Sequence, residues 1–490
     1  MPEAGASPRT ITRELGQWVA GARFESLPPE LLNRIRTDAL DSVAVGLFGH
    51  TQPWVSPAVD LWIEHGGRPD ASVWGRPAKL PVPKAVMANS HAMNSFEYDD
   101  TYVWGGFGTH PGNNVTPSAL AISEFLGNVS GKDFLLALAV GHEVSIRVML
   151  GFVETRRGYN HTALTSTFGS AATAAKLLGL NGQQSTWALG SAGGYVGGLL
   201  TIPPHSMVKR MVNARAAEGG VIGALLAQRG FTGIENLLES ENGGFYATVS
   251  QKFNLDKTAD ELGTTFYSVN VHTKRYPMVT SAHSVIEAAC RLVAQERFAS
   301  TEVTRIIVHT NSTAQKLTVG FAPDTFSSAQ MSLTFGVAAA IRTGNVLPEA
   351  LLDDGLENKE THRLLSVIEA VKDARFDEMS RGKAGSGTPG QVEVYLRDGR
   401  HLVSPVVPEA TRMTDEEIEA KARVLMTRAV GAERSEDIIQ FFRAIERRSV
   451  DELVTLLQAR RSGKRTRRAA RQAPSAKAKT RSKAARRRAK

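Results

Sequence analysis

Two adjacent carboxylates and a histidine stand close together in the stretch NSFEYDDTYVWGGFGTH, residues 94–110. Asp99 and Asp100 precede a glycine-rich loop, and His110 follows it. A carboxylate beside an imidazole can transfer protons near neutral pH, which is the chemistry of general acid and base catalysis. The local pattern is also typical of a capped turn, in which the aspartate bonds the turn and the histidine only packs. The segment is therefore a candidate catalytic centre that needs support from elsewhere in the chain.

Two further groups of polar side chains lie near predicted helix starts. His161 begins a helical stretch of small and apolar residues, where the helix N-terminus favours anions. Lys209 and Arg210 precede a helix expected from about residue 213. The structural alternatives are a capping or packing histidine and a solvated helix entrance.

A third group lies in the segment VHTKRYPMVTSAH, which carries Lys274, Arg275, Tyr276 and His283. Together the candidates supply a carboxylate, histidines, lysines and a tyrosine. This set suits proton abstraction next to a carboxylate, because lysine and arginine can hold a polyanionic substrate while an acid–base pair moves the proton. The enolate that develops also needs positive charge or hydrogen-bond donors.

Several familiar catalytic devices are absent from the sequence. His142 and Glu143 do not form a zincin motif, because Ile146 occupies the position of the second histidine, and Ser191 lacks the glycine of a nucleophile elbow. The single cysteine, Cys290, excludes an internal disulfide and a cysteine-based zinc cluster. The sequence does not suggest a metal or a dinucleotide site.

The net charge of +9 is unevenly distributed over the 490 residues. Residues 460–490 contain 15 Lys or Arg and no acidic residue, whereas the rest of the chain contains 43 basic and 49 acidic residues. We expect this tail to be disordered, either as a solvated appendage or as a nonspecific, salt-sensitive contact for nucleic acid or another polyanion. The absence of a secretory pattern and of a long apolar run predicts a cytoplasmic protein.

Helical periodicity dominates residues 28 to about 262. Apolar residues recur at helical spacing from Leu31 to Leu47. Glycines repeat four apart between positions 190 and 198, which predicts a helix face that another helix approaches closely. Further helices are expected at residues 115–127, 132–150, 162–179, 184–200 and 213–229.

The pattern changes at about residue 264. Residues 266–272 and 303–310 are typical of extended segments, and the turn at 398–399 indicates a hairpin. Helices are expected between them, at residues 281–297 and 328–342, so this part is of the α+β class. Thr414 and Glu417 form a capping box before two or three final helices, which could rejoin the first domain or stand alone.

The motifs YDDT, HPG and PSALAISEFLG resemble a block of the MmgE/PrpD family, which includes 2-methylcitrate dehydratase, cis-aconitate decarboxylase and iminodisuccinate epimerase. The similarity continues over about residues 20–440, in the segments LDSVAVGLFG, ASVWGRPAKLPVPKAVMANS, MVKRMVNARAAEGGVIGALLAQRGFTG, KRYPMVTSAH and AQMSLTFGVAAA.

The resemblance implies a mainly α fold. A large all-helical domain, residues 1–263, would be joined by a smaller α+β lid domain, residues 264–405, and by C-terminal helices, residues 406–459, that return to the helical domain. The disordered basic tail, residues 460–490, would follow. Members are typically homodimers that use neither a metal nor an organic cofactor.

The resemblance also assigns roles to the candidate residues. His110 would exchange the proton at the reacting carbon, Asp100 would orient it, and His161 would assist. The residues implied to bind substrate are Lys209, Lys274 and Tyr276. Departures from the family pattern, where specificity would be set, are Tyr102, Gly112, Asn160 and Val212.

The sequence therefore predicts a cofactor-independent lyase that acts on a small di- or tricarboxylate, with dehydration as the default reaction. Decarboxylation and epimerisation are the alternatives within the family, because all three reactions move a proton beside a carboxylate. An alternative of another class is an inactive helical scaffold that binds nucleic acid through residues 460–490.

Overall fold

The computed structural model describes residues 10–105, 107–156, 158–199, 206–318, 323–352, 355–380 and 388–458. The chain up to Ala459 forms one compact unit. The basic tail predicted at residues 460–490 lies outside the described residues. Within the described ranges, no helix is both long enough and apolar enough to cross a membrane.

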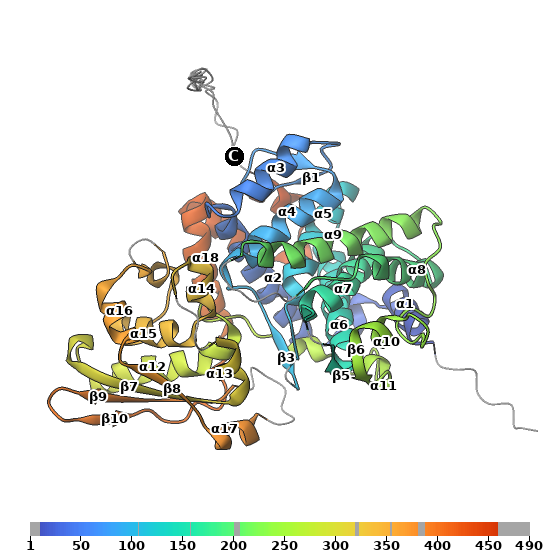
Figure 1. The fold of residues 1–490 in the computed structure, drawn as a ribbon. Coiled ribbons are helices and arrows are strands. Elements are labelled where there is room, and N and C mark those ends of the chain that lie inside the picture. Colours follow the sequence, from blue (N-terminus) through green and yellow to red (C-terminus); the bar gives the residue numbers. More distant parts are fainter. Residues whose placement is uncertain are drawn as a thin grey trace, which may run out of the picture. The chain divides into compact units, whose positions relative to one another are not determined.

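The first half of this unit is built of helices (Figure 1). Helix α7 packs against both α6 and α9, and α2, α4 and α5 lie beside these helices. Asn160 caps α7, because its side chain accepts a hydrogen bond from the Ala163 N–H at 3.0 Å. The helices are α1 (Ile11–Gly21), α2 (Pro29–His50), α3 (Ser56–His65), α4 (Val82–Met93), α5 (Pro111–Leu126), α6 (Gly131–Leu150), α7 (His161–Leu177), α8 (Gly182–Ala192), α9 (Val208–Gln228), α10 (Phe245–Val249) and α11 (Asp256–Ala259).

The helical half also contains short two-stranded sheets among its described residues. They are β1 (Ala71–Ser72) with β2 (Lys79–Leu80), β3 (Tyr102–Trp104) with β4 (Phe107–Thr109), and β5 (Phe152–Thr155) with β6 (Ser250–Phe253). All three pairings are antiparallel.

Three local predictions are wrong. Helix α8 ends at Ala192, so the glycines after it do not share its face; Gly190 instead lets the Ile234 backbone approach, since a Cβ there would lie 2.2 Å from the Ile234 carbonyl oxygen. Helix α9 begins at Val208, which places Lys209 and Arg210 inside its first turn. Residues 266–272 contain a 3₁₀ turn, Tyr267–Asn270, where a strand was expected.

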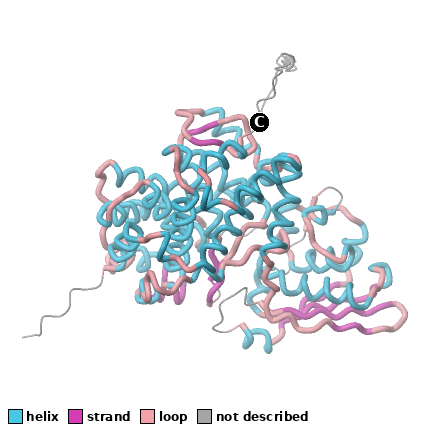
Figure 2. The backbone as a smooth tube through the Cα atoms, turned by 180° about the vertical axis from the view of Figure 1, so that it is seen from behind, coloured by secondary structure: helices cyan, strands magenta, loops and turns pink. Residues whose placement is uncertain are grey.

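A four-stranded sheet with the order β10-β9-β7-β8 forms the core of the α+β region (Figure 2). The strands are β7 (Val303–Thr310), β8 (Ile368–Lys372), β9 (Gly390–Leu396) and β10 (His401–Val403). β8 runs parallel to β7, and β9 runs antiparallel to both β7 and β10. Residues of β9 alternate between buried and half-buried, as expected for a sheet that is covered on one face.

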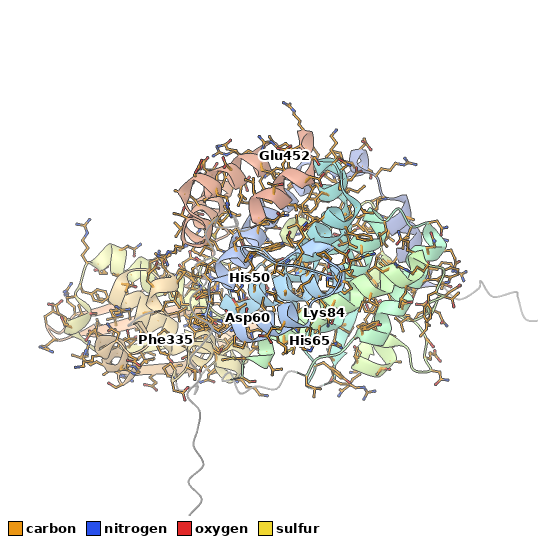
Figure 3. All side chains as sticks on the ribbon, turned by 90° about the horizontal axis from the view of Figure 1, so that it is seen from above. His50, Asp60, His65, Lys84, Phe335 and Glu452 are labelled. Atoms are coloured by element: carbon orange, nitrogen blue, oxygen red, sulfur yellow. The ribbon has the colours of Figure 1, made fainter. Side chains whose placement is uncertain are left out.

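Helices pack on this sheet. α12 (His283–Glu296) and α15 (Leu333–Thr343) contact the strands, and Phe335 of α15 is fully buried (Figure 3). The other helices of the region are α13 (Ser312–Thr318), α14 (Phe326–Met331), α16 (Lys359–Leu365) and α17 (Ala374–Met379). The strand at 303–310, the hairpin and the helix predicted at 281–297 are confirmed. The single helix predicted at 328–342 is wrong in one respect, because the helix is interrupted at Ser332, whose side chain caps α15 after α14 has ended.

The last helices return to the first half of the chain. α18 (Asp415–Val430) packs on α2, α19 (Ala432–Arg443) packs on α18, and α20 (Val450–Leu457) contacts α5. The capping box of Thr414 and Glu417 begins α18 as predicted. The fold is therefore mainly α, with an α+β region and returning C-terminal helices, whereas the domain boundaries stay predictions.

Candidate active site

The β3–β4 hairpin brings the two ends of the glycine-rich loop together. Tyr102 pairs with Thr109, and Gly105 turns the chain with a φ of 57°, a left-handed conformation that glycine adopts readily. His110 therefore lies beside Asp100, and its Nδ1 is 2.5 Å from the Asp100 carbonyl oxygen. A carbonyl can only accept a hydrogen bond, so Nδ1 carries the proton and Nε2 is the nitrogen that can exchange one.

The side chains of the two aspartates point in different directions. Asp99 Oδ2 lies 3.9 Å from His110 Nδ1, whereas the Asp100 carboxylate accepts a hydrogen bond from the Gly112 N–H at 2.9 Å. We expected the Asp100 carboxylate to orient the imidazole, but the backbone carbonyl of Asp100 makes that contact. The carboxylate found within 4 Å of His110 is that of Asp99.

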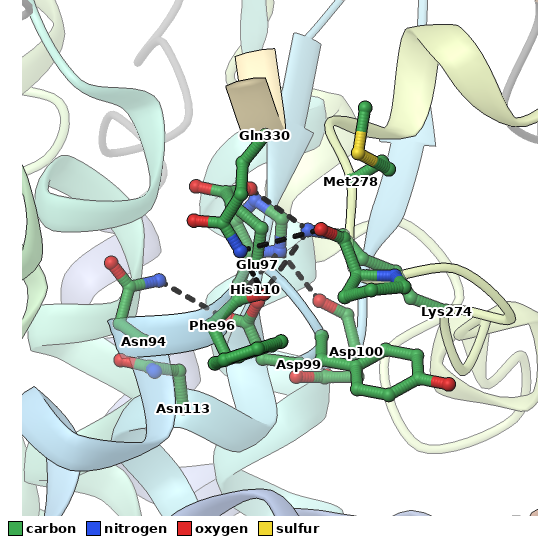
Figure 4. A network of polar contacts seen from close by, with 12 residues as sticks. Asn94, Phe96, Glu97, Asp99, Asp100, His110, Asn113, Lys274, Met278 and Gln330 are labelled. Carbon is green, nitrogen blue, oxygen red and sulfur yellow. Dashed lines mark hydrogen bonds and ion pairs between the residues drawn. The ribbon is translucent and has the colours of Figure 1, made fainter. Parts of the chain in front are cut away.

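Glu97 is a buried carboxylate that forms ion pairs with several cations of the site, and Figure 4 shows it beside Lys274. Lys274 Nζ lies 3.1 Å from Glu97 Oε2 and 3.5 Å from Asp99 Oδ1, so it bridges the two acids. Lys209 and Arg210 also form ion pairs with Glu97. Glu97 has a φ of 52°, an uncommon conformation for a residue with a side chain, and such strain often marks a functional segment.

The site lies where the helical half meets the α+β region. Arg210 of α9 donates to the side-chain oxygen of Gln330 on α14 at 2.7 Å. The segments before and after the site are also joined directly, because Thr101 and His272 exchange two backbone hydrogen bonds of 2.8 Å. Side chains far apart in sequence are therefore fixed against one another.

Cations decide the ionisation of the two acids. Burial by itself raises the pKa of Glu97, but Lys209, Lys274 and Arg210 outweigh it and hold the pKa well below its ordinary value. Asp99 is shifted the same way, because Lys274 and His110 outweigh its burial and lower its pKa. Both carboxylates are therefore ionised at neutral pH.

Burial also changes the pKa of two basic groups of the site, Lys209 and His110. Burial lowers the pKa of Lys209 to about 8, although Glu97 partly counteracts it, and burial also lowers the pKa of His110. The side chains of His110 and Lys209 are 23% and 25% exposed, whereas those of Asp99 and Lys274 are almost fully buried. A substrate would consequently meet His110 and Lys209 first.

His161 lies apart from this cluster. It is the first residue of α7, its Nε2 lies 3.1 Å from Thr155 Oγ1, and its ring packs edge-on against Phe107 with centroids 5.2 Å apart. Burial lowers the pKa of His161. Among the described residues, no hydrogen bond joins it to Glu97, Asp99 or His110.

Tyr276 also points away from the cluster. Its ring packs against His283 with centroids 5.3 Å apart, and its hydroxyl bonds the Cys290 thiol. It lines a cavity of about 570 Å³ between α12 and α18. Of the six predicted residues, the structure thus brings Asp100, His110, Lys209 and Lys274 together, and leaves His161 and Tyr276 outside their hydrogen-bond network.

Sequence reasoning did not assign Glu97, Arg210 or Gln330 to the site, and it chose Asp100 over Asp99. The spacing of the acids in EYD gave no usable signal, because Glu97 has a left-handed backbone and the segment is not an extended strand. No local signal marked Gln330.

A buried carboxylate pair, a half-buried histidine and several cations between a helical body and an α+β region form a candidate acid–base site. The chain belongs to the MmgE/PrpD family: the MmgE/PrpD N-terminal domain matches residues 13–258, and the MmgE/PrpD C-terminal domain matches residues 276–447.

Several curated proteins are similar in sequence to this chain over most of their own length. A cis-aconitate decarboxylase-like protein, oryM, of Aspergillus oryzae is 28% identical over 91% of this chain and 97% of its own. The cis-aconitate decarboxylase of Aspergillus terreus is 26% identical over 81% of this chain and 84% of its own. The human cis-aconitate decarboxylase is 28% identical over 74% of this chain and 76% of its own.

Proposed function

We propose that this chain is a lyase that acts without a cofactor on a small di- or tricarboxylate, by proton transfer beside a carboxylate. The observation that carries the proposal is the half-exposed face of His110, held by the Asp100 carbonyl next to ionised Asp99 and Lys274. This arrangement supplies a proton carrier and positive charge at one place, which is what an enolate-like intermediate requires.

The charge balance of the site supports an anionic substrate. Among the described residues, Lys209, Arg210 and Lys274 pair with two ionised carboxylates, those of Glu97 and Asp99, so this part of the cluster has an excess of positive charge. Lys209 is the more accessible of the two lysines, and it would take the first substrate carboxylate. Lys274 would stabilise the charge that develops at the reacting carbon.

The names of the relatives favour decarboxylation as the reaction. In such a step the bond between carbon and the departing carboxylate breaks, CO₂ leaves, and the electron pair spreads into the neighbouring unsaturated carboxylate. His110, which first takes up a second proton from solvent at Nε2, then delivers that proton to carbon and returns to the neutral form with its proton on Nδ1. Dehydration, our first expectation from the sequence, and epimerisation remain alternatives, because each needs the same proton carrier.

The experiment is an NMR survey in D₂O with cis-aconitate, citrate, methylcitrate and iminodisuccinate. We expect one compound to be turned over or to exchange a proton, and His110→Ala to lower kcat by about 10²–10⁴-fold. His65→Ala is the control, because that exposed histidine lies at the end of α3. Absence of both turnover and exchange with the wild-type protein, or equal rates for His110→Ala, would reject the proposal.

Three further parts of the proposal concern location and partners. We propose a homodimer by family resemblance, and a cytoplasmic location that the single cysteine supports. The composition of residues 460–490 supports nonspecific polyanion binding. Light scattering tests the dimer, fractionation the location, and salt-titrated DNA binding, with a variant that ends at Ala459 as control, tests the tail.

The alternative to a lyase is an inactive helical scaffold that binds nucleic acid through residues 460–490. It would show tail-dependent DNA binding without turnover or exchange of any compound in the survey.

A further inference from the structure

Lys421 is a buried lysine of α18 that touches both chain segments of the candidate active site. Its Nζ donates to Asp41 Oδ2 on α2 at 3.1 Å, and to the backbone carbonyls of Tyr98 at 2.9 Å and of Lys274 at 3.0 Å. An ammonium group has three N–H donors, so these three acceptors use all of them. The ammonium also lies 3.8 Å from the centre of the Tyr98 ring.

The two carbonyls belong to the segments that carry the charged groups of the site. Tyr98 stands between Glu97 and Asp99, and Lys274 is the cation that bridges those two acids. A single ammonium therefore fixes the backbone on either side of the Lys274–carboxylate contacts. The Tyr98 hydroxyl strengthens the same link by donating to the Arg275 carbonyl at 3.0 Å.

These segments need an external anchor. Glu97 holds a left-handed backbone conformation, and Lys274 lies in no helix or strand. A displacement of about 1 Å at a catalytic group can cost about 10²-fold in rate. The C-terminal helix α18 supplies the anchor from the opposite end of the chain.

We propose that Lys421 is a positioning residue, which sets the distance between Lys274 and the pair Glu97–Asp99 through the backbone of residues 98 and 274. The inference rests on the proposed function for its catalytic consequence, but its structural part can be tested without any substrate. It also gives the returning C-terminal helices a role in the chemistry.

The first experiment is hydrogen–deuterium exchange of Lys421→Met. We expect amides of residues 97–101 and 272–276 to exchange about tenfold faster or more than in the wild type. The matched control is Lys176→Met, because Lys176 also donates to two backbone carbonyls, those of Ala20 at 2.9 Å and Ala22 at 2.5 Å, in another part of the helical half. Unchanged exchange in both segments would overturn the inference, whether or not the protein is a lyase.

Loss of the lysine leaves Asp41 buried without its cation, which can prevent folding. The double variant Asp41→Asn with Lys421→Met removes both charges and keeps the test available. Lys421→Arg should restore slow exchange in part, because a guanidinium can donate to the same carbonyls.

The second experiment is a double-mutant cycle on the turnover or exchange found in the survey. We expect Lys421→Met to lower kcat/KM of the folded protein about tenfold or more, and to have little further effect in the background of Lys274→Ala. Equal losses in both backgrounds, or loosened segments with unchanged kcat/KM, would show that Lys421 does not act through Lys274. Inactivity of the wild type would reject the proposed function and leave the exchange experiment to decide the structural part.

Discussion

Two groups of buried acids, close together in the molecule, behave in opposite ways. Glu97 and Asp99 have lowered pKa values, whereas burial raises the pKa of Asp38 to about 7 and raises that of Asp100 well above its ordinary value. All four side chains are buried to a similar degree. Burial alone therefore does not determine which acid is ionised. The number of nearby cations matters, because Asp38 has Arg34 at 3.7 Å and still has a raised pKa, whereas Glu97 pairs with Lys209, Arg210 and Lys274.

The contacts of each group explain the difference. Lys274 bridges Glu97 and Asp99, whereas Asp100 receives only the N–H of Gly112 and has Asp38 as a neighbouring charge. Asp100 Oδ1 has no hydrogen-bond partner among the described residues. The raised pKa of Asp100, caused mainly by burial, favours its protonated form relative to Asp99, and Asp99 provides the negative charge next to His110.

Removal of the bridging cation should have the largest effect. Lys274→Met leaves Glu97 and Asp99 with less positive charge, so we expect about 3–5 kcal/mol of lost stability and a loss of activity of about 10²-fold or more. Chemical denaturation and steady-state kinetics measure the two effects. The double variant Glu97→Gln with Lys274→Met should regain part of the stability, and failure to do so would argue against mutual compensation.

A matched pair of substitutions distinguishes the roles of Asp99 and Asp100. Asp99→Asn removes a charge, so we expect it to lower kcat by about 10²-fold and to shift the pH profile that His110 produces. Asp100→Asn replaces a carboxyl with a raised pKa by a group of the same shape, and it should cost less than about tenfold. The reverse order of effects would restore Asp100 to the role expected from the sequence.

The pH dependence of stability tests Asp38. Between about pH 4 and about pH 7 the folded protein keeps a proton on Asp38 that the unfolded chain has released, so this residue lowers stability as the pH rises. Asp38→Asn should therefore gain stability over the wild type, by on the order of a few kcal/mol, between about pH 5 and about pH 8. Urea denaturation at about pH 5 and about pH 8 measures the difference in unfolding free energy between Asp38→Asn and the wild type. Asp60→Asn, at an exposed position, is the control. A difference that is the same at both pH values would contradict the raised pKa of Asp38.

The smallest effect is expected at Tyr276. Its hydroxyl bonds Cys290 and does not face the cations, so Tyr276→Phe should change kcat/KM by less than about threefold. Kinetics with the best substrate of the survey tests this expectation. A large increase in KM would instead support the substrate-binding role that the family resemblance implies.

Much of the fold followed from local patterns. The apolar spacing from Leu31 to Leu47 gave α2, and the turn at 398–399 gave the β9–β10 hairpin. The repeated glycines gave a wrong prediction. Gly190 and Gly193 allow the approach of Ile234 and Leu237, which lie in an irregular segment, whereas a Cβ at Gly194 or Gly197 would have no neighbour within 4 Å.

The composition of the site was less predictable, because its contacts span long stretches of chain. Arg210 meets Glu97 across 113 residues and Gln330 across 120, and only the tertiary fold brings these three residues together. The choice between Asp99 and Asp100 depends on the direction of each side chain, which follows from backbone geometry around Glu97 that no local pattern specifies.

Gly112, one of the departures from the family pattern, has an evolutionary consequence. A Cβ at this position would lie 2.8 Å from Asp100 Oδ1 and 2.8 Å from Ser42 Oγ. A side chain at position 112 would therefore require the side chains of Ser42 and Asp100 to shift. Residues 42 and 112 should covary within the lineage, with a smaller residue at 42 wherever a side chain stands at 112.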